Sequence, residues 1–127
     1  MTPVLFINCS SAPFLNDIMS GKKKYETRTR DMLRSLIGQR VLLAETGHGR
    51  PVVRCSAVIR SHSVITDRNY WTYFIRKDAC IPAGSRYDWQ PDTSVKHIYA
   101  LSDVAPVPPF PVPDGVRHGR VWMELSA

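Results

Sequence analysis

Residues 18–28 carry the most informative pattern in the chain, and they read Ile-Met-Ser-Gly-Lys-Lys-Lys-Tyr-Glu-Thr-Arg. Gly21 stands where the residue after a helix is expected, because glycine readily adopts the left-handed conformation that ends many helices. From Lys24 to Arg30, charged and less polar residues alternate, and a period of two is typical of a strand. The segment therefore predicts a helix that ends near Ser20, followed directly by a cationic strand.

The residues before this segment supply the helix and a strand that precedes it. Residues 4–7 form a short apolar run and predict a buried strand. The apolar positions of residues 11–20 fall at helical spacing and are Phe14, Leu15, Ile18 and Met19. Ser10 and Ser11 at the helix start have two interpretations. They are N-capping hydroxyls, or they hold a phosphate or carboxylate together with the free N–H groups of the first turn.

Alternation along the cationic strand divides its side chains between two faces. One face carries Lys24, Glu26, Arg28 and Arg30, and the other carries Tyr25, Thr27 and Thr29. Residues on the same face lie about 7 Å apart, which approximates the phosphate spacing along a single nucleic-acid strand. Glu26 is placed to orient Arg28 or to accept a hydrogen bond from the amino group of a base. The alternative is an edge strand whose charges only prevent aggregation.

The rest of the chain predicts a mainly β domain. Further strands are expected at residues 40–46, 52–61, 96–103 and 120–125, with a hairpin between the first two. Asp31 is expected to cap a helical turn that ends at Gly38, and Thr66 or Asp67 a helix that runs to about Lys77. The prolines of residues 106–113 predict an extended connection. This order favours an α+β fold, mainly β: a small, mostly antiparallel barrel flanked by two to three helices.

Composition bounds the class of protein. A chain of 127 residues with 43% hydrophobic and 22% charged residues is ordinary for one globular domain. The net charge of +6 lies in residues 1–60, which hold ten basic and four acidic side chains, and this asymmetry favours an anionic partner. No signal peptide or membrane span is evident, and three cysteines without a Cys-x-x-Cys pair suit a reducing compartment. We therefore expect a cytoplasmic location and no membrane partner.

The central segment also carries a family resemblance. Gly21, Lys23, Glu26 and Arg28 form the pattern Gly-x-Lys-x-x-Glu-x-Arg, which resembles the signature of the ASCH family. Members of that family also begin with a strand that leads into this helix, and end with a tryptophan-bearing strand, here around Trp122. The resemblance implies one ASCH-like domain over residues 1–127 with a PUA-like β-barrel. It also implies a cleft, lined by Lys23, Glu26 and Arg28, that accepts RNA or a modified nucleoside.

Charge and resemblance together predict binding of RNA or a nucleotide. Single-stranded RNA or a modified nucleoside is the expected ligand, and single-stranded DNA is a further one. The expected contact residues are Ser10, Ser11, Lys22, Lys23, Lys24, Glu26, Arg28 and Arg30. An enzyme is the alternative, because relatives include amidohydrolases of acetylated cytidine and proteins that are reported to cut RNA. Its catalytic residues would be Lys23, Tyr25 and Glu26. We expect no cofactor, and a monomer or weak homodimer.

Three other features have both a structural and a functional interpretation. The aromatic residues of the second helix, Tyr70, Trp71, Tyr73 and Phe74, are either helix core or a stacking platform for bases. The four histidines lack metal-ligand spacing, so no metal site is expected, and His118 is either a surface residue or a proton-transfer group beside the cleft. The proline-rich residues 106–113 are either a rigid connector or a ligand for another protein.

Overall fold

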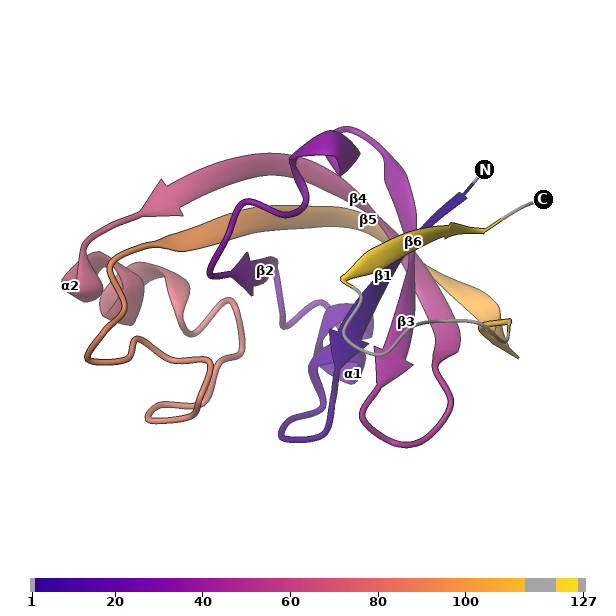
Figure 1. Ribbon diagram of the computed structural model, residues 1–127, viewed down its shortest axis with the longest axis horizontal. Helices are drawn as coiled ribbons and strands as arrows, with labels where there is room; N and C mark the ends of the chain where they lie inside the picture. Colours follow the sequence, from indigo (N-terminus) through magenta and orange to yellow (C-terminus); the bar gives the residue numbers. More distant parts are fainter. Residues whose placement is uncertain (1, 114–120, 126–127) are drawn as a thin grey trace.

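The computed structural model describes residues 2–113 and 121–125, and its centre is a six-stranded sheet in the order β2-β5-β4-β3-β1-β6 (Figure 1). The strands are β1 (Thr2–Asn8), β2 (Tyr25–Arg28), β3 (Arg40–Thr46), β4 (Val52–Ile65), β5 (Lys96–Pro111) and β6 (Trp122–Leu125). The β1–β3 ladder is parallel, whereas β1–β6, β2–β5, β3–β4 and β4–β5 are antiparallel. The sheet is therefore mixed, and the expected hairpin between β3 and β4 is present.

The prediction of a closed barrel is wrong, because the sheet stays open between its two edge strands. Within the described residues, β2 and β6 share no ladder. β6 pairs with β1 only from Thr2 to Leu5, so no strand among the described residues flanks the last residues of β1 on that side. β2 cannot fill the gap because it is only four residues long and the chain bends at Thr29 and Arg30. An opening is thus left between β2 and the end of β1.

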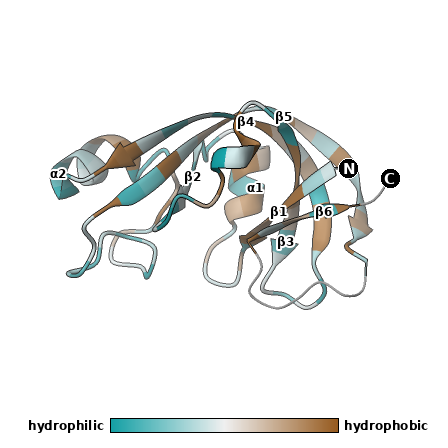
Figure 2. Cartoon of the chain, turned by 45° about the horizontal axis from the view of Figure 1, so that its top comes forward, coloured by the Kyte–Doolittle hydropathy of each residue, from teal (hydrophilic) through white to brown (hydrophobic). Residues whose placement is uncertain are grey.

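The core lies where the strands alternate as the sequence indicates. Residues 52–61 alternate in the sequence, which puts Val53, Cys55, Ala57 and Ile59 on one face of β4, and each of them is fully buried. The ladder shifts register between Val53 and Cys55, and Val53 belongs to a second, smaller cluster with Val4, Phe6, Ala44 and Val112. Helix α1 (Phe14–Met19) packs Phe14, Leu15 and Ile18 into the larger core, which also contains Cys55, Ala57 and Ile59. Figure 2 shows α1 and the strands around β1 largely in the hydrophobic colour, while loops at the ends of the molecule are paler or hydrophilic.

Helix α1 is shorter than residues 11–20. Its N-cap is Pro13, which offers no side-chain hydrogen bond, and Ser10 and Ser11 lie outside the helix. Proline has no N–H of its own and suits the first turn of a helix, which explains why the helix begins after it. The C-terminal end agrees with the prediction, because Ser20 is the C-cap and Gly21 follows with a φ of 83°.

The proline-rich segment is not a connection between strands. β5 continues through it to Pro111, and it pairs with β4 along its whole length, so that the two strands form one long curved arm (Figure 1). The ladder tolerates prolines because its register shifts at three places. One shift surrounds Asp103, whose φ of 51° is left-handed. Its carboxylate accepts hydrogen bonds from Ser102 and Arg60.

The second helical region changes type along its length. Asp67 caps it as expected, by accepting from the amide of Asn69, and α2 (Arg68–Tyr70) continues directly into a π-helix, η2 (Trp71–Ile75). The wider π turn places Trp71 and Ile75 in the core. Tyr70, Tyr73 and Phe74, for which helix core was one of two interpretations, are exposed instead. None of the described helices combines the length and apolarity needed to cross a membrane.

The turn after β2 also differs from its prediction. It contains a short 3-10 helix, η1 (Arg34–Leu36), whose N-cap is Leu33. Asp31 is too far from that helix start to cap it, and its carboxylate instead contacts Arg34 and Tyr99. The last strand begins at Trp122 rather than Arg120, and Arg120 and His118 lie outside the described residues.

Candidate functional site

A small cavity of about 70 Å³ opens where β2 approaches the end of β1. Its lining combines four segments, which are β1, α1, the signature segment and the loop between η2 and β5, and the signature segment supplies the charges. The lining residues are Ile7, Asn8, Phe14, Lys23, Glu26, Thr27, Arg28, Ile81 and Tyr87. The three residues that the family resemblance assigned to a cleft, Lys23, Glu26 and Arg28, therefore share one cavity.

Lys23 is the most deeply placed of the three charges. Its side chain is only 3% exposed, and Nζ donates to the carbonyl oxygen of Ala79 at 2.5 Å. The same Nζ lies 4.8 Å from the centre of the Phe14 ring, which gives a cation–π contact. Burial lowers the pKa of Lys23, and the negative charge of Glu26 opposes that shift. The ammonium group is thus costly to keep charged in the free protein.

Glu26 lies in the wall of the cavity with a 9% exposed side chain. Its Oε1 accepts a hydrogen bond from the amide of Thr27 at 2.9 Å, which holds the carboxylate in place. Its Oε2 lies 3.6 Å from Nη2 of Arg28, at the distance of a weak ion pair. A carboxylate has lone pairs for about four hydrogen bonds, so Glu26 keeps acceptor capacity toward the cavity.

Arg28 connects β2 with β1 across the cavity opening. Its Nη2 donates to the carbonyl oxygen of Phe6 at 3.2 Å, across the opening between β2 and β1. Its Nε is buried, and no acceptor among the described residues lies within hydrogen-bond distance of it. An unsatisfied buried donor of a charged group costs on the order of 1–3 kcal/mol. The ligand-free protein is therefore destabilised at this site.

The other predicted contact residues are distributed around the cavity rather than inside it. Lys22, Lys24 and Arg30 are exposed at the two ends of β2. The predicted cationic strand is too long, because β2 covers only Tyr25–Arg28 and so contains Glu26 and Arg28 but neither Lys24 nor Arg30. Ser10 and Ser11 are exposed, and the amide and hydroxyl of Ser10 both donate to Oδ1 of Asn8. Asn8 itself lines the cavity, so Ser10 acts on the site indirectly, by holding the side chain of Asn8 in place.

Tyr25 lies in a different place from the rest of the predicted catalytic set. It lines a wider groove of about 480 Å³, as expected from its position on the opposite face of β2. That groove is lined by Tyr25, Ser63, Val64, Ile65, Thr66, Asp67, Tyr70, Ile75 and Ile98. Lys23 and Glu26 line the small cavity together, and the structure does not bring Tyr25 to them.

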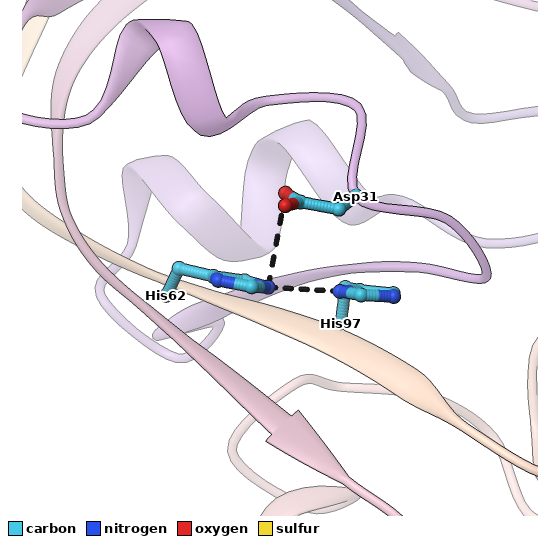
Figure 3. A group of neighbouring side chains, drawn as sticks. All are labelled: Asp31, His62 and His97. Carbon is cyan, nitrogen blue, oxygen red and sulfur yellow. Dashed lines mark hydrogen bonds and ion pairs between the residues drawn. The ribbon is translucent and has the colours of Figure 1, made fainter.

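A second polar cluster lies beside the cavity, and the sequence spacing gave no sign of it. Asp31, His62 and His97 come from the turn after β2, from β4 and from β5, and their side chains converge (Figure 3). The cluster depends on register, since His97 lies opposite Arg28 on β2 and opposite Val64 on β4. Residues separated by more than thirty positions meet only through that pairing, so a search for closely spaced ligands could not find them.

Comparisons with known proteins give similarity in structure only. No protein-family model and no curated protein sequence matches the chain. The solved structure of ASCH from Zymomonas mobilis is similar, with a TM-score of 0.77, 20% identity, and coverage of 98% of this chain and 87% of that chain. A tyrosine-to-phenylalanine variant and a serine-to-alanine variant of the same bacterial protein give TM-scores of 0.76 and 0.74 at 20% identity. They cover 98% of this chain, and 90% and 88% of their own. The chain thus has the fold of an ASCH domain, as the signature segment predicted.

Proposed function

We propose that the chain binds single-stranded RNA or a nucleotide, and that the cavity between β1 and β2 receives one group of that ligand. The observation that carries the proposal is that two cationic residues, the buried Lys23 and the half-buried Arg28, line one cavity, and that the buried Nε of Arg28 has no acceptor among the described residues. An anionic or carbonyl oxygen placed there would satisfy Arg28 and offset the buried charge of Lys23. Ligand binding would thus remove the free-energy cost of the unpaired Arg28 donor and of the buried Lys23 charge, and this gain would add to the affinity.

The size of the cavity limits what enters it. Pockets that enclose a whole small ligand have volumes of about 300–1,000 Å³, whereas this cavity has about 70 Å³. It therefore takes a part of the ligand, such as a phosphate oxygen or the edge of a base. Glu26 offers an acceptor next to two cations, which suits a group with an amino hydrogen beside a carbonyl or phosphate oxygen. A nucleotide has both kinds of atom.

The rest of the ligand would lie along the surface on either side of β2. Lys22, Lys24 and Arg30 are exposed there, and each is free to reach a phosphate as a flexible side chain. Three or four neutralised phosphates on a single strand predict a log–log slope of affinity against salt of roughly −2 to −3. We therefore expect the cavity to determine selectivity and the exposed cations to supply most of the affinity.

The test is a titration of labelled single-stranded RNA and of mononucleotides at several salt concentrations. Arg28→Met should weaken binding at least tenfold at every salt concentration, because it removes a contact inside the cavity. Lys24→Ala should instead make the salt slope shallower by about 0.7. Arg34→Ala is the matched control, since this arginine is also basic but 74% exposed and outside the cavity. Equal affinity for Arg28→Met and Arg34→Ala would overturn the proposal.

An enzyme on RNA or on a modified nucleoside is the second candidate, and one observation favours it. Lys23 is buried, its pKa is lowered by that burial, and Glu26 lines the same cavity, which is an environment typical of functional lysines. Incubation with labelled RNA and with a panel of acylated nucleosides separates the two functions. Turnover that disappears in Lys23→Ala would establish an enzyme, and binding without turnover would establish a binding module.

A further inference from the structure

The polar cluster of Asp31, His62 and His97 has the donor set of a metal site. One donor atom from each side chain can be chosen so that all three lie within 4.8 Å of one another. The Nε2 of His62 lies 2.8 Å from Nδ1 of His97 and 3.8 Å from Oδ1 of Asp31. Dashed lines mark these two contacts in Figure 3. In a tetrahedral zinc site with bonds of about 2.0–2.1 Å, neighbouring donor atoms are about 3.3 Å apart. The two measured separations lie on either side of that value.

The three side chains are held in place by neighbours that do not belong to the cluster. The buried Tyr99 donates its hydroxyl to Oδ1 of Asp31 at 2.7 Å, and its ring packs 5.0 Å from that of His62. Hydrogen bonds that orient a ligating carboxylate in this way are a regular feature of metal sites. Arg34 also contacts Asp31, but its side chain is 74% exposed and can move away without cost to the core.

A hydrogen bond now joins the facing nitrogens of His62 and His97, and coordination of a metal ion by both nitrogens can replace it. The ring planes differ by 6° and the ring centres are 5.1 Å apart, so a nitrogen pair at 2.8 Å requires the rings to lie side by side. One of the two nitrogens carries the shared proton. If each neutral ring carries its proton on the far nitrogen, both facing nitrogens present lone pairs. Coordination then requires the pair to open by about half an ångström and the rings to tilt.

We propose that Asp31, His62 and His97 bind a divalent transition-metal ion, with zinc as the best match. Imidazole and carboxylate donors suit zinc, and three protein ligands leave a fourth position for water or for a group of a bound ligand. The site is accessible to an ion, because the side chains of His62 and Asp31 are 13% and 19% exposed. It is distinct from the cavity, although His97 lies opposite Arg28, so the two sites share one face of the sheet.

The test measures zinc binding to the untagged, chelator-treated chain by calorimetry, and cobalt binding by visible absorption. A Cys80→Ser background removes the thiol of the one described cysteine that is not fully buried, so that it cannot compete for the ion. We expect one ion per chain, a dissociation constant in the micromolar range or below, and the intense absorption of four-coordinate cobalt. His62→Gln and His97→Gln should each weaken binding more than tenfold, and Tyr99→Phe about tenfold.

The control is His48→Gln, because His48 is an exposed histidine that contacts the carbonyl oxygen of Cys9 outside the cluster. Zinc affinity should be unchanged in this variant. The proposal is overturned if zinc does not bind saturably, or if His62→Gln and His97→Gln bind it as tightly as His48→Gln. Should a variant not fold, NMR of the unaltered chain decides, since zinc must shift the ring signals of His62 and His97 and leave those of His48 in place.

Discussion

Nη2 of Arg28 donates to the carbonyl oxygen of Phe6 at 3.2 Å, and this contact spans two strands that have no ladder between them in the described chain. The sheet curves far enough to bring β2 near β1, but a side chain rather than backbone pairing connects them. The cavity lies at this junction, and Arg28 lines it. The same residue therefore contributes to the closure of the fold and to the proposed binding site.

Replacement of Arg28 by methionine should loosen β2 as well as weaken ligand binding. A hydrogen bond from a charged group contributes about 1.5–3 kcal/mol, and β2 is otherwise held by only four paired residues. Amide exchange in β2 should therefore accelerate about tenfold or more. Hydrogen exchange followed by NMR checks this, with the β3–β4 hairpin as the internal reference. Equal acceleration in both regions would show a general loss of stability instead.

Replacement of Lys23 by methionine should change how stability depends on pH. The folded chain has a pKa below the ordinary 10.5 at this lysine, because burial disfavours the charged form. Between that lowered value and 10.5, the unfolded chain binds a proton at Lys23 that the folded chain does not. The free energy of unfolding of the native sequence therefore rises with pH across this window. Lys23→Met should lack that rise in urea unfolding at pH 8 and pH 10; parallel curves would contradict the prediction.

Alanine at position 47 should destabilise the protein more than alanine at position 49. Both glycines have left-handed φ angles, 98° and 88°, so both substitutions incur backbone strain of about 1 kcal/mol. A Cβ at Gly47 would lie 2.8 Å from the amide nitrogen of Ser10 and 2.9 Å from Oδ1 of Asn8, whereas one at Gly49 meets nothing within 4 Å. We expect a further loss of about 1–3 kcal/mol for Gly47→Ala. Denaturant unfolding of the pair checks this.

Asparagine at position 88 should destabilise the loop that follows the π-helix. Burial alone would raise the pKa of Asp88, but hydrogen bonds from Trp71, Gly84 and Trp89 outweigh it and hold the pKa below 3.8. The ionised carboxylate of Asp88 therefore contributes fully to stability above pH 3.8, the ordinary pKa of an aspartate. This contribution is lost as the pH falls toward the lower pKa of the folded protein. Asp88→Asn should cost about 1–3 kcal/mol at pH 7 and less at pH 3, as measured by urea unfolding. A loss that is the same at both pH values would contradict this account.

The sequence predicted the signature segment and the alternating strands well, because their patterns are local. Gly21 ends a helix, β3 has its predicted bounds, and Cys55, Ala57 and Ile59 of β4 alternate into one core. The resemblance of residues 21–28 to the ASCH signature agrees with the fold. These predictions depend on a few neighbouring residues, whose backbone preferences and burial act in the same direction.

Features that depend on pairing across the chain were not predictable. The open edge of the sheet follows from where β6 stops along β1, and no local pattern encodes that position. The inward turn of Lys23, which lies just before β2, follows from its contact with Ala79, a residue more than fifty positions away. The metal-ligand cluster requires the register of β4 against β5. Tyr70 and Phe74 are exposed because the helix widens into a π turn, which residue periodicity does not predict.

The proline-bearing half of β5 has a consequence for how copies of the protein meet. Beyond Ala100, the side of this strand away from β4 has no partner strand in the described chain, so it is exposed to a second molecule. Four of its residues, Pro106, Pro108, Pro109 and Pro111, have no amide hydrogen to donate. A foreign strand that approached this border would find too few donors to dock. The prolines thus disfavour edge-to-edge pairing of two molecules along this border.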